Sequence, residues 1–343
     1  MTDKAAKNPG RYCGIIPPMV TPLDTDGNLD PAGLETLIEH ILGGGVNGLF
    51  ILGTTGEAPS LCETVKNEII QRTCRQVNGR VPVLVGITNT CFEASLKIAW
   101  TAQQNDADAL VLSTPYYFEL SQQDLTVYIK KLLRKIELPV FLYNNPACTK
   151  VWFELSTLGK LMSCPQIIGL KDSSADMIYL QRAYQLATLH RPDWSVLIGP
   201  EELLAEAVLT GIHGGIPGGA NLFPQFYVTL YQTALEQRTD LIQSLQNIVL
   251  QLSSSIYGIE KGGYLKALKY ALACVGICGE TPAQPIQCLP MHLKNRIRQK
   301  IEKDILPAME KLLPNIKANH IILKVESDNI LPIRNKRRTS SKN

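Results

Sequence analysis

A lysine at the end of a short apolar run is the residue best suited to covalent chemistry in this sequence. The run Ile167-Ile168-Gly169-Leu170 precedes Lys171, and polar residues follow it. Such a run is typical of a strand buried on both faces of a parallel sheet, so we expect Lys171 at the strand's carboxyl end. Burial lowers the pKa of an amine, and a free amine can form a Schiff base with a ketone. The simpler alternative is a lysine that extends from a strand end into solvent.

Residues at the ends of other predicted strands complete a candidate site. The glycines of Gly53-Thr54-Thr55-Gly56-Glu57 let backbone N–H groups approach a ligand, and its two hydroxyls suit a small carboxylate. Tyr143 ends one strand, Tyr117 follows another, and small residues around Ile216 leave room for a substrate. The predicted substrate-binding residues are Gly53, Thr54, Thr55, Gly199 and Ile216.

These residues support one chemical hypothesis. Lys171 attacks a 2-keto acid, Tyr143 moves protons to and from the carbinolamine, and the Thr54-Thr55 turn holds the carboxylate. Thr54 and Tyr117 supply the partners that a tyrosine hydroxyl needs to relay protons. Each tyrosine taken alone also fits a packed aromatic residue.

The elements that must position these residues alternate along the chain. Apolar strands predicted at 13–16, 48–52, 81–87, 109–113, 140–143, 167–171, 195–198 and 214–216 are mostly separated by one amphipathic helix. Eight such units predict a (β/α)8 TIM barrel over residues 12–235, whose active site lies at the carboxyl ends of the strands. A doubly wound open sheet is the alternative. The G-x-G-x-x-G at Gly43–Gly48 follows a helix and precedes a strand, the wrong order for a dinucleotide site, and predicts a loop.

Local signals predict several helix ends. Asp30-Pro31 and Ser121 read as helix starts, Ser60-Leu61-Cys62-Glu63 as a capping box, and Asn78-Gly79 as a helix end. After residue 235 the pattern predicts a C-terminal all-helical domain over 236–315, with helices at 241–256, 264–274 and 291–313. A polar segment at 1–11 and a basic tail of unassigned structure at 316–343 complete the chain.

Composition and charge exclude several function classes. A net charge of +3, with the basic excess mostly in the tail, gives no nucleic-acid footprint. No segment is long and apolar enough to span a bilayer. Nine scattered cysteines without a Cys-x-x-Cys pair, and five histidines without ligand spacing, predict reduced thiols and no metal site. We therefore expect a cytoplasmic protein without a metal or cofactor.

The three motifs Gly53-Thr54-Thr55-Gly56-Glu57, Tyr143-Asn144-Asn145-Pro146 and Gly169-Leu170-Lys171-Asp172, in that order, resemble those of the dihydrodipicolinate synthase / N-acetylneuraminate lyase family of class I aldolases. The resemblance runs from Tyr12 to at least Leu289 and implies the same barrel with a helical C-terminal domain, usually in a homotetramer. It also implies pyruvate bound as a Schiff base on Lys171, with Tyr143 transferring protons and Thr54 and Thr55 binding the carboxylate. Tyr117 matches a tyrosine that dihydrodipicolinate synthases lend across a subunit interface.

One departure from the family pattern bears on the substrate. In dihydrodipicolinate synthases an arginine two residues after the proline grips the carboxylate of aspartate semialdehyde, and here that residue is Cys148. A thiol cannot replace a bidentate cation, and losing such a pair costs roughly 2–5 kcal/mol. A neutral, hydroxylated aldehyde fits better, as in 2-keto-3-deoxy sugar acid aldolases or N-acetylneuraminate lyases. Gly214–Asn221 does not closely match the lyase's own segment.

We therefore expect a lyase that makes or breaks a C–C bond between pyruvate and an aldehyde. Dihydrodipicolinate synthase and N-acetylneuraminate lyase activities stay open, as does a dehydratase or deaminase acting through the same enamine. A catalytically silent sensor that binds a keto acid is the alternative of another class, although a sensor needs no proton relay. A scaffold role for the basic tail is a weaker one.

Overall fold

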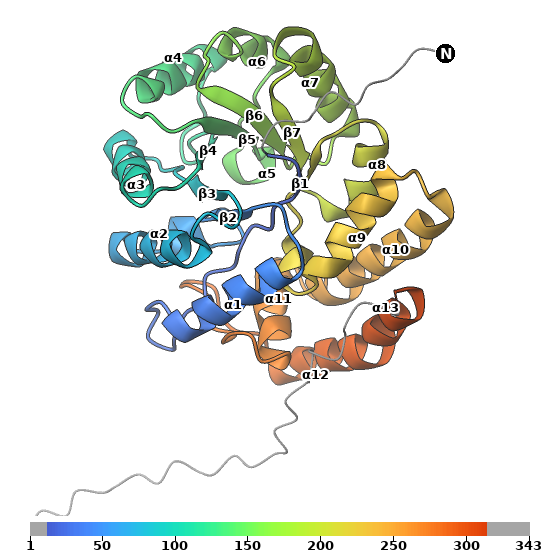
Figure 1. Ribbon diagram of the computed structural model, residues 1–343. Coiled ribbons are helices and arrows are strands. Elements are labelled where there is room, and N and C mark those ends of the chain that lie inside the picture. Colours follow the sequence, from blue (N-terminus) through green and yellow to red (C-terminus); the bar gives the residue numbers. More distant parts are fainter. Residues whose placement is uncertain (1–11, 314–343) are drawn as a thin grey trace, which may run out of the picture.

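Eight short strands form one parallel sheet in the computed structural model, which describes residues 12–313 (Figure 1). The polar segment 1–11 and the basic tail 316–343 lie outside the described residues. The strands are β1 (Gly14–Ile15), β2 (Leu49–Ile51), β3 (Val83–Gly86), β4 (Ala109–Ser113), β5 (Val140–Asn144), β6 (Ile167–Asp172), β7 (Ser195–Ile198) and β8 (Gly214–Gly215).

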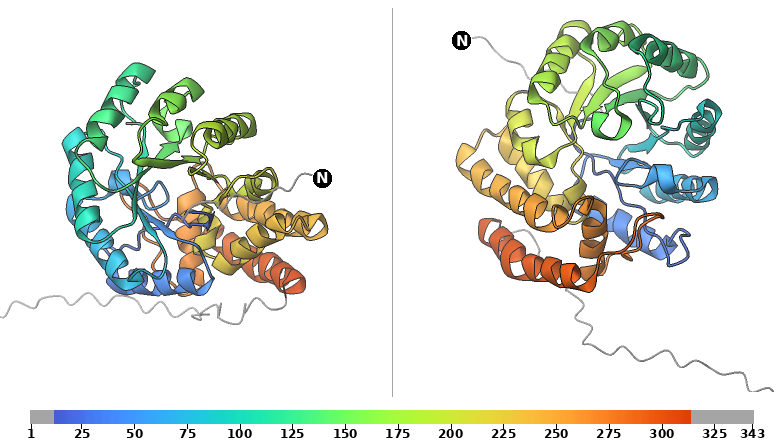
Figure 2. Two further views of the ribbon diagram at one scale, coloured as in Figure 1. Left: turned by 45° about the horizontal axis from the view of Figure 1, so that its top comes forward. Right: turned by 180° about the vertical axis from the view of Figure 1, so that it is seen from behind.

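The sheet curls so that its two edges approach each other (Figures 1 and 2). Its strand order is β1-β8-β7-β6-β5-β4-β3-β2, and every neighbouring pair is parallel. The chain after β1 meets β2 through a parallel bridge between Pro18 and Phe50, and the Phe50 N–H donates to the Pro17 carbonyl over 2.9 Å. The predicted repeat of β-α units and their parallel order are thereby confirmed, and the open doubly wound order is not found.

Helices surround this sheet and continue beyond it. The helices that alternate with the strands are α1 (Pro31–Gly43), α2 (Glu63–Val77), α3 (Phe92–Gln104), α4 (Gln122–Leu133), α5 (Pro146–Thr149), α6 (Leu155–Leu161), α7 (Met177–His190), α8 (Leu204–Leu209) and α9 (Pro224–Leu235). Those that follow are α10 (Thr239–Leu252), α11 (Tyr264–Cys274), α12 (Met291–Lys300) and α13 (Leu306–Leu312). Helices thus occur in all three stretches where they were predicted after residue 235, with π-helical turns at Ser253–Tyr257 and Ile301–Ile305.

Two apolar clusters stabilise the fold. The smaller one fills the inside of the curled sheet and includes Phe50, Phe141, Tyr143 and Ile216. The larger one joins the outer face of the sheet to the helices, and it also contains buried residues of α10 to α13 such as Leu245 and Leu268. The C-terminal helices therefore share a core with the helices that cover the sheet, while the domain boundary expected at residue 235 stays a prediction.

The predicted caps have mixed outcomes. The two predicted helix starts are confirmed: the Asp30 side chain accepts a hydrogen bond from the Gly33 N–H, and the Ser121 side chain accepts one from the Asp124 N–H. The predicted helix end is confirmed as well, since α2 ends at Asn78 in the left-handed conformation. The capping box at Ser60 is wrong. Ser60 lies in a 3₁₀ turn, and its own N–H donates to the Glu57 carbonyl. Helix α2 therefore begins only at Glu63. The glycine-rich Gly43–Gly48 segment joins α1 to β2 as predicted.

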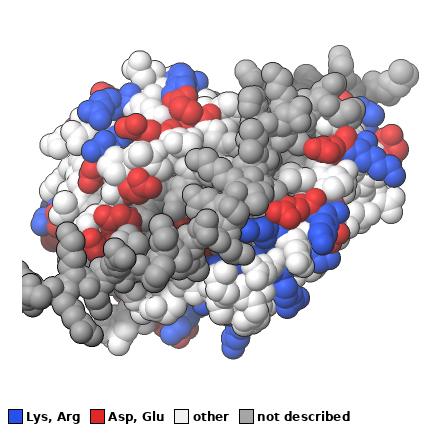
Figure 3. Space-filling model, turned by 90° about the horizontal axis from the view of Figure 1, so that it is seen from below, with Lys and Arg blue, Asp and Glu red and all other residues white. Residues whose placement is uncertain are grey.

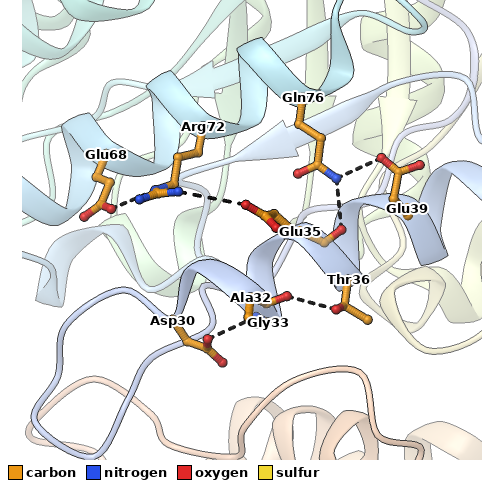
Figure 4. Close-up of polar contacts among 9 residues, drawn as sticks. All are labelled: Asp30, Ala32, Gly33, Glu35, Thr36, Glu39, Glu68, Arg72 and Gln76. Atoms are coloured by element: carbon orange, nitrogen blue, oxygen red, sulfur yellow. Dashed lines mark hydrogen bonds and ion pairs between the residues drawn. The ribbon is translucent and has the colours of Figure 1, made fainter.

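Polar contacts brace the outer helices α1 and α2 against each other (Figure 4). The Arg72 guanidinium pairs with Glu68 at 2.7 Å and lies 4.0 Å from Glu35, while the Gln76 amide donates to Glu39. Such exposed pairs each contribute little to stability, about 0–1 kcal/mol. Charges of both signs are interspersed on the face seen from below (Figure 3). None of the helices in residues 12–313 is long and apolar enough to cross a membrane.

Candidate active site

The register between β5 and β6 brings the predicted nucleophile and the predicted proton-transfer residue together. Tyr143 pairs with Lys171 in the parallel ladder, and the next pair is Asn144 with Asp172. Neighbouring residues at one level of a parallel sheet face the same side. The Lys171 Nζ lies 4.0 Å from the centre of the Tyr143 ring and 4.9 Å from that of Phe50. The two predicted residues therefore share the inner face of the curled sheet at its carboxyl end.

Lys171 is buried, with only 4% of its surface exposed. Burial lowers the pKa of its amine, against the opposing effects of Tyr143, Cys148 and Asp172, which favour the charged form. More of the side chain is therefore free amine at neutral pH than for a lysine in solvent. The alternative of a lysine extending into solvent is excluded by this burial.

The pair that follows, Asn144 and Asp172, fixes the ends of both strands. The Asn144 amide donates to the Asp172 carboxylate over 2.7 Å, and the Ser174 hydroxyl donates to the other oxygen over 2.8 Å. Burial raises the pKa of Asp172 to about 6, against these hydrogen bonds. This cross-strand contact lies one residue beyond the Tyr143 and Lys171 pair and so helps to set their separation.

The Tyr143 hydroxyl belongs to a small polar cluster. It lies 3.5 Å from the Thr54 Oγ1, and the Asn145 amide donates both to it, over 3.1 Å, and to the Thr54 hydroxyl, over 3.3 Å. Because Tyr143 accepts from Asn145, its own proton remains available for Thr54 or for a substrate. Tyr143 and Thr54 thus form the contact that was predicted.

The turn Gly53–Glu57 has its two threonines in different surroundings. Thr54 is exposed beside Tyr143, whereas Thr55 is buried, with its Oγ1 3.4 Å from the Tyr264 hydroxyl of α11. Gly53 cannot carry a side chain, since a Cβ there would lie 2.6 Å from the Phe50 ring. The turn therefore connects the Tyr143 cluster to the C-terminal helices.

Two cavities open beside the Tyr143–Lys171 contact, with volumes of about 650 and 870 Å³ including their mouths. Gly53, Thr54, Tyr143, Asn145 and Cys148 are among the residues that line the first. Lys171, Ser173, Gly199, Glu201, Glu202, Ile216, Ser253 and Tyr264 are among those that line the second. Such volumes suit a small organic ligand.

The predicted substrate-binding glycine of the second cavity has a steric reason to be glycine. A Cβ on Gly199 would lie 2.0 Å from the Ser173 Oγ. Beside it, the Glu201 carboxylate accepts from the Tyr227 hydroxyl over 2.5 Å and from the Gly219 N–H over 2.7 Å. Burial raises the pKa of Glu201 to about 7, against these hydrogen bonds. A carboxyl group that can hold a proton near neutral pH thus borders the same cavity as Lys171.

Tyr117 is the predicted site residue that one chain does not bring to the others. It is 73% exposed, packs edge-to-face on Phe118 with ring centres 5.0 Å apart, and lines neither cavity, whereas the preceding Tyr116 lines the first. Its role through a subunit interface stays a prediction. Lys150 is exposed, in a left-handed conformation, and is not among the residues lining either cavity, while Cys148 lines the first.

Sequence reasoning missed Asn145, Glu201 and Tyr264 as site residues. Asn145 stood next to a predicted strand end, which is a usable signal, and Glu201 follows β7 in the same way. Tyr264 has no such signal because it starts a helix far along the chain. Within residues 12–313, no cluster of histidine, cysteine, aspartate and glutamate could hold a metal ion, and all nine cysteines are free.

Known proteins resemble this chain over most of its length. A model of the "Dihydrodipicolinate synthetase family" matches residues 11–305. A probable 2-dehydro-3-deoxy-D-pentonate aldolase, YjhH of Escherichia coli, is 30% identical over 305 residues, covering 89% of this chain and 99% of its own.

Two solved structures are similar as well. The dihydrodipicolinate synthase structure from Bacteroides thetaiotaomicron is 44% identical with a TM-score of 0.82, covering 84% of this chain and 98% of its own. The YagE structure from E. coli, in complex with pyruvate, is 28% identical with a TM-score of 0.81, and the match covers 85% of this chain and 98% of the YagE chain. With a buried lysine beside a tyrosine at the strand ends and these relatives along nearly the whole fold, the chain belongs to the dihydrodipicolinate synthetase family of lyases.

Proposed function

We propose that this protein is a class I aldolase that joins pyruvate to an aldehyde, or splits the product, through a Schiff base on Lys171. The observation that carries the proposal is the buried Lys171 amine, 4.0 Å from the Tyr143 ring. The curled parallel sheet, as a closed (β/α)8 barrel with a C-terminal helical domain, would hold both residues at its catalytic end.

The reaction follows from these groups. The Lys171 amine attacks the ketone carbon of pyruvate, and the carbinolamine loses water to give an iminium ion. Loss of a proton from the methyl carbon gives an enamine, whose carbon attacks the aldehyde; water then releases the 2-keto acid and regenerates the amine. Tyr143 would carry protons in these steps, and the Thr54-Thr55 turn would hold the pyruvate carboxylate.

The aldehyde partner is best proposed as neutral and hydroxylated, so the product is a 2-keto-3-deoxy sugar acid. Among the described residues that line the two cavities, Lys171 is the sole basic residue, so no other group there could pair with a second carboxylate. Ser173, Glu202 and Ser253 instead offer hydrogen-bonding groups for sugar hydroxyls. The aldolase name of the similar YjhH supports this choice.

4-Hydroxy-tetrahydrodipicolinate synthase activity is the second candidate, favoured by the 44% identity to the Bacteroides structure. Against it stands Cys148, which lines the cavity in the place of an arginine that would bind a second carboxylate. Dehydration of a related keto acid through the same enamine, and N-acetylneuraminate lyase activity, are further outcomes of the test below. Tyr117, exposed beside Phe118, fits a residue lent to a second copy in a homo-oligomer.

The test begins with pyruvate and borohydride, followed by peptide mapping. We expect one reduced adduct, on Lys171, and none in Lys171→Ala, with Lys150→Ala as the control that still forms it. Turnover is then compared for pyruvate with glyceraldehyde, glycolaldehyde, N-acetylmannosamine and aspartate semialdehyde. No adduct on wild-type protein would contradict the Schiff base, an adduct without turnover would favour the sensor, and preference for aspartate semialdehyde would favour the second candidate.

A further inference from the structure

Helix α11 contacts the Gly53–Glu57 turn with two side chains. The Tyr264 hydroxyl lies 3.4 Å from the Thr55 Oγ1, and the Lys269 ammonium forms an ion pair with the Glu57 carboxylate. The two charged side chains are among the most buried of the described chain, with 0% and 1% of their surfaces exposed. The C-terminal helices thus meet the turn on which the carboxylate-binding hydroxyls lie.

Each member of the ion pair also makes a hydrogen bond with the backbone. Lys269 also donates to the Thr281 carbonyl over 2.7 Å, and the second Glu57 oxygen accepts from the Ala283 N–H over 2.6 Å. Removing one partner of such a pair leaves an uncompensated charge in the protein interior, which is far more costly than removing both. The pair therefore constrains Glu57 strongly with respect to α11.

Glu57 in turn constrains the two threonines. Its backbone N–H donates to the Thr54 carbonyl over 3.1 Å and closes the turn. Its φ of 58° places a non-glycine residue in the left-handed region, which is unfavourable unless surrounding contacts hold it there. A shift of the Glu57 side chain would therefore move Thr54 and Thr55 directly.

We propose that Glu57 and Lys269 are positioning residues, whose buried ion pair holds the Thr54-Thr55 turn in the geometry that binds the carboxylate of the 2-keto acid. This inference rests on the proposed function of the turn. Neither side chain lines the cavities, so the pair acts through Thr54 and Thr55. The C-terminal helices are then part of the substrate site as well as of the core.

The experiment measures the rate at which borohydride traps pyruvate on the protein, over a range of pyruvate concentrations. It gives two quantities, the half-saturating pyruvate concentration and the limiting rate. In Glu57→Gln and in Lys269→Met we expect the half-saturating concentration to rise about tenfold or more, with a limiting rate within about threefold of wild type. The double variant should lie closer to wild type than either single variant, because no unpaired charge is left. Tyr264→Phe, which removes only the hydroxyl beside Thr55, should raise the half-saturating pyruvate concentration by about threefold.

Ile297→Ala is the control, because Ile297 is a fully buried residue of α12 outside both the turn and α11. It should lower the melting temperature and leave the half-saturating pyruvate concentration unchanged, which separates positioning from stability. Folded ion-pair variants with wild-type pyruvate affinity would overturn the inference, as would an equal loss in Ile297→Ala. Should neither single variant fold, wild-type pyruvate affinity in the double variant, which lacks the ion pair, overturns it. Wild-type protein that traps no pyruvate would instead overturn the proposed function.

Discussion

The Lys171 Nζ lies 4.0 Å above the Tyr143 ring, and the two residues pair in register between β5 and β6. The Phe50 ring lies 4.9 Å from the same nitrogen, and burial of the amine lowers its pKa, although Tyr143 itself opposes this shift. The same contact brings a phenol to the atom that would form the Schiff base. The proposed nucleophile and the proposed proton-transfer residue thus lie on one pair of neighbouring strands.

The lowered pKa of Lys171 predicts the pH dependence of Schiff-base formation. The rate of pyruvate trapping should rise as the amine loses its proton and level off clearly below the ~10.4 of an ordinary lysine. Initial rates of borohydride-trapped adduct, measured by intact-protein mass across pH, give this profile. A rate that still rises up to the pKa of a solvent-exposed lysine would contradict the burial of the amine.

Loss of the Tyr143 hydroxyl should slow the chemistry. We expect Tyr143→Phe to lower kcat by roughly 10²–10⁴, the range for losing a general acid or base. The control is Tyr12→Phe, whose hydroxyl donates to the Asp108 carbonyl at the opposite end of the strands. That variant should cost about 1 kcal/mol of stability and keep its kcat. Equal kcat values in the two variants would remove Tyr143 from the mechanism.

The strand ends that carry Tyr143 and Lys171 were predictable because each of these two strands is an apolar run that ends in polar residues. Ala109–Ser113 and Ser195–Ile198 have the predicted bounds, and Lys171 and Tyr143 emerge where expected. Position in a parallel sheet then determines proximity, since the carboxyl ends of the strands meet at one edge.

Contacts between distant elements were not predictable in this way. Tyr264 begins a correctly predicted helix, yet its neighbour Thr55 lies 209 residues earlier, and only the packing of α11 against the turn after β2 brings them together. The capping box at Ser60 failed for a local reason, because the left-handed Glu57 leads into a 3₁₀ turn that already uses the Ser60 N–H. The residue pattern of one helix or strand shows neither which distant element packs against it nor the conformation of the turn that leads into it.

A cation at position 148 should change the aldehyde preference. Cys148 lines the cavity beside Tyr143, so Cys148→Arg places a guanidinium where a second carboxylate could bind. A charge-assisted hydrogen bond there should shift the ratio of kcat/KM toward aspartate semialdehyde, relative to glyceraldehyde, by about ten- to hundredfold. Cys148→Ser, which adds a hydroxyl and no charge, should leave the ratio nearly unchanged. An equal shift in both variants would rule out charge as the cause.

Glu201 should make stability depend on pH. Burial raises its folded-state pKa from 4.5 to about 7, so the folded protein binds the proton more tightly than the unfolded chain does. Its contribution to stability is therefore fully present below about pH 4.5 and lost as pH rises through about pH 7. Between about pH 5 and about pH 8, wild type should lose about 2–3 kcal/mol more unfolding free energy than Glu201→Gln.

Urea unfolding of both proteins at the two pH values measures this difference. All other titrating groups are common to the two chains, so their contributions cancel in the comparison. Parallel losses in wild type and Glu201→Gln would show that Glu201 is already ionised in the folded protein across this range.

We expect Asn145 to support the proposed chemistry in a way that differs from the proposed role of the Glu57–Lys269 pair, and kinetics can separate the two. Its amide donates to both the Tyr143 and the Thr54 hydroxyls, so it orients the phenol without contacting the ion pair. Asn145→Leu should therefore lower kcat by about tenfold, the cost of losing its hydrogen bond to the phenol, and raise the half-saturating pyruvate concentration by less, about threefold, because the same amide also donates to Thr54.

Asn105→Ala is the matched control for that variant, since this amide donates to the Thr101 carbonyl at the end of α3, away from the site. It should cost a comparable amount of stability and keep the wild-type kcat. A fall in pyruvate affinity with unchanged kcat in Asn145→Leu would assign Asn145 to substrate binding instead. A larger fall in kcat than in pyruvate affinity would mean that the phenol must be held in one orientation to transfer protons.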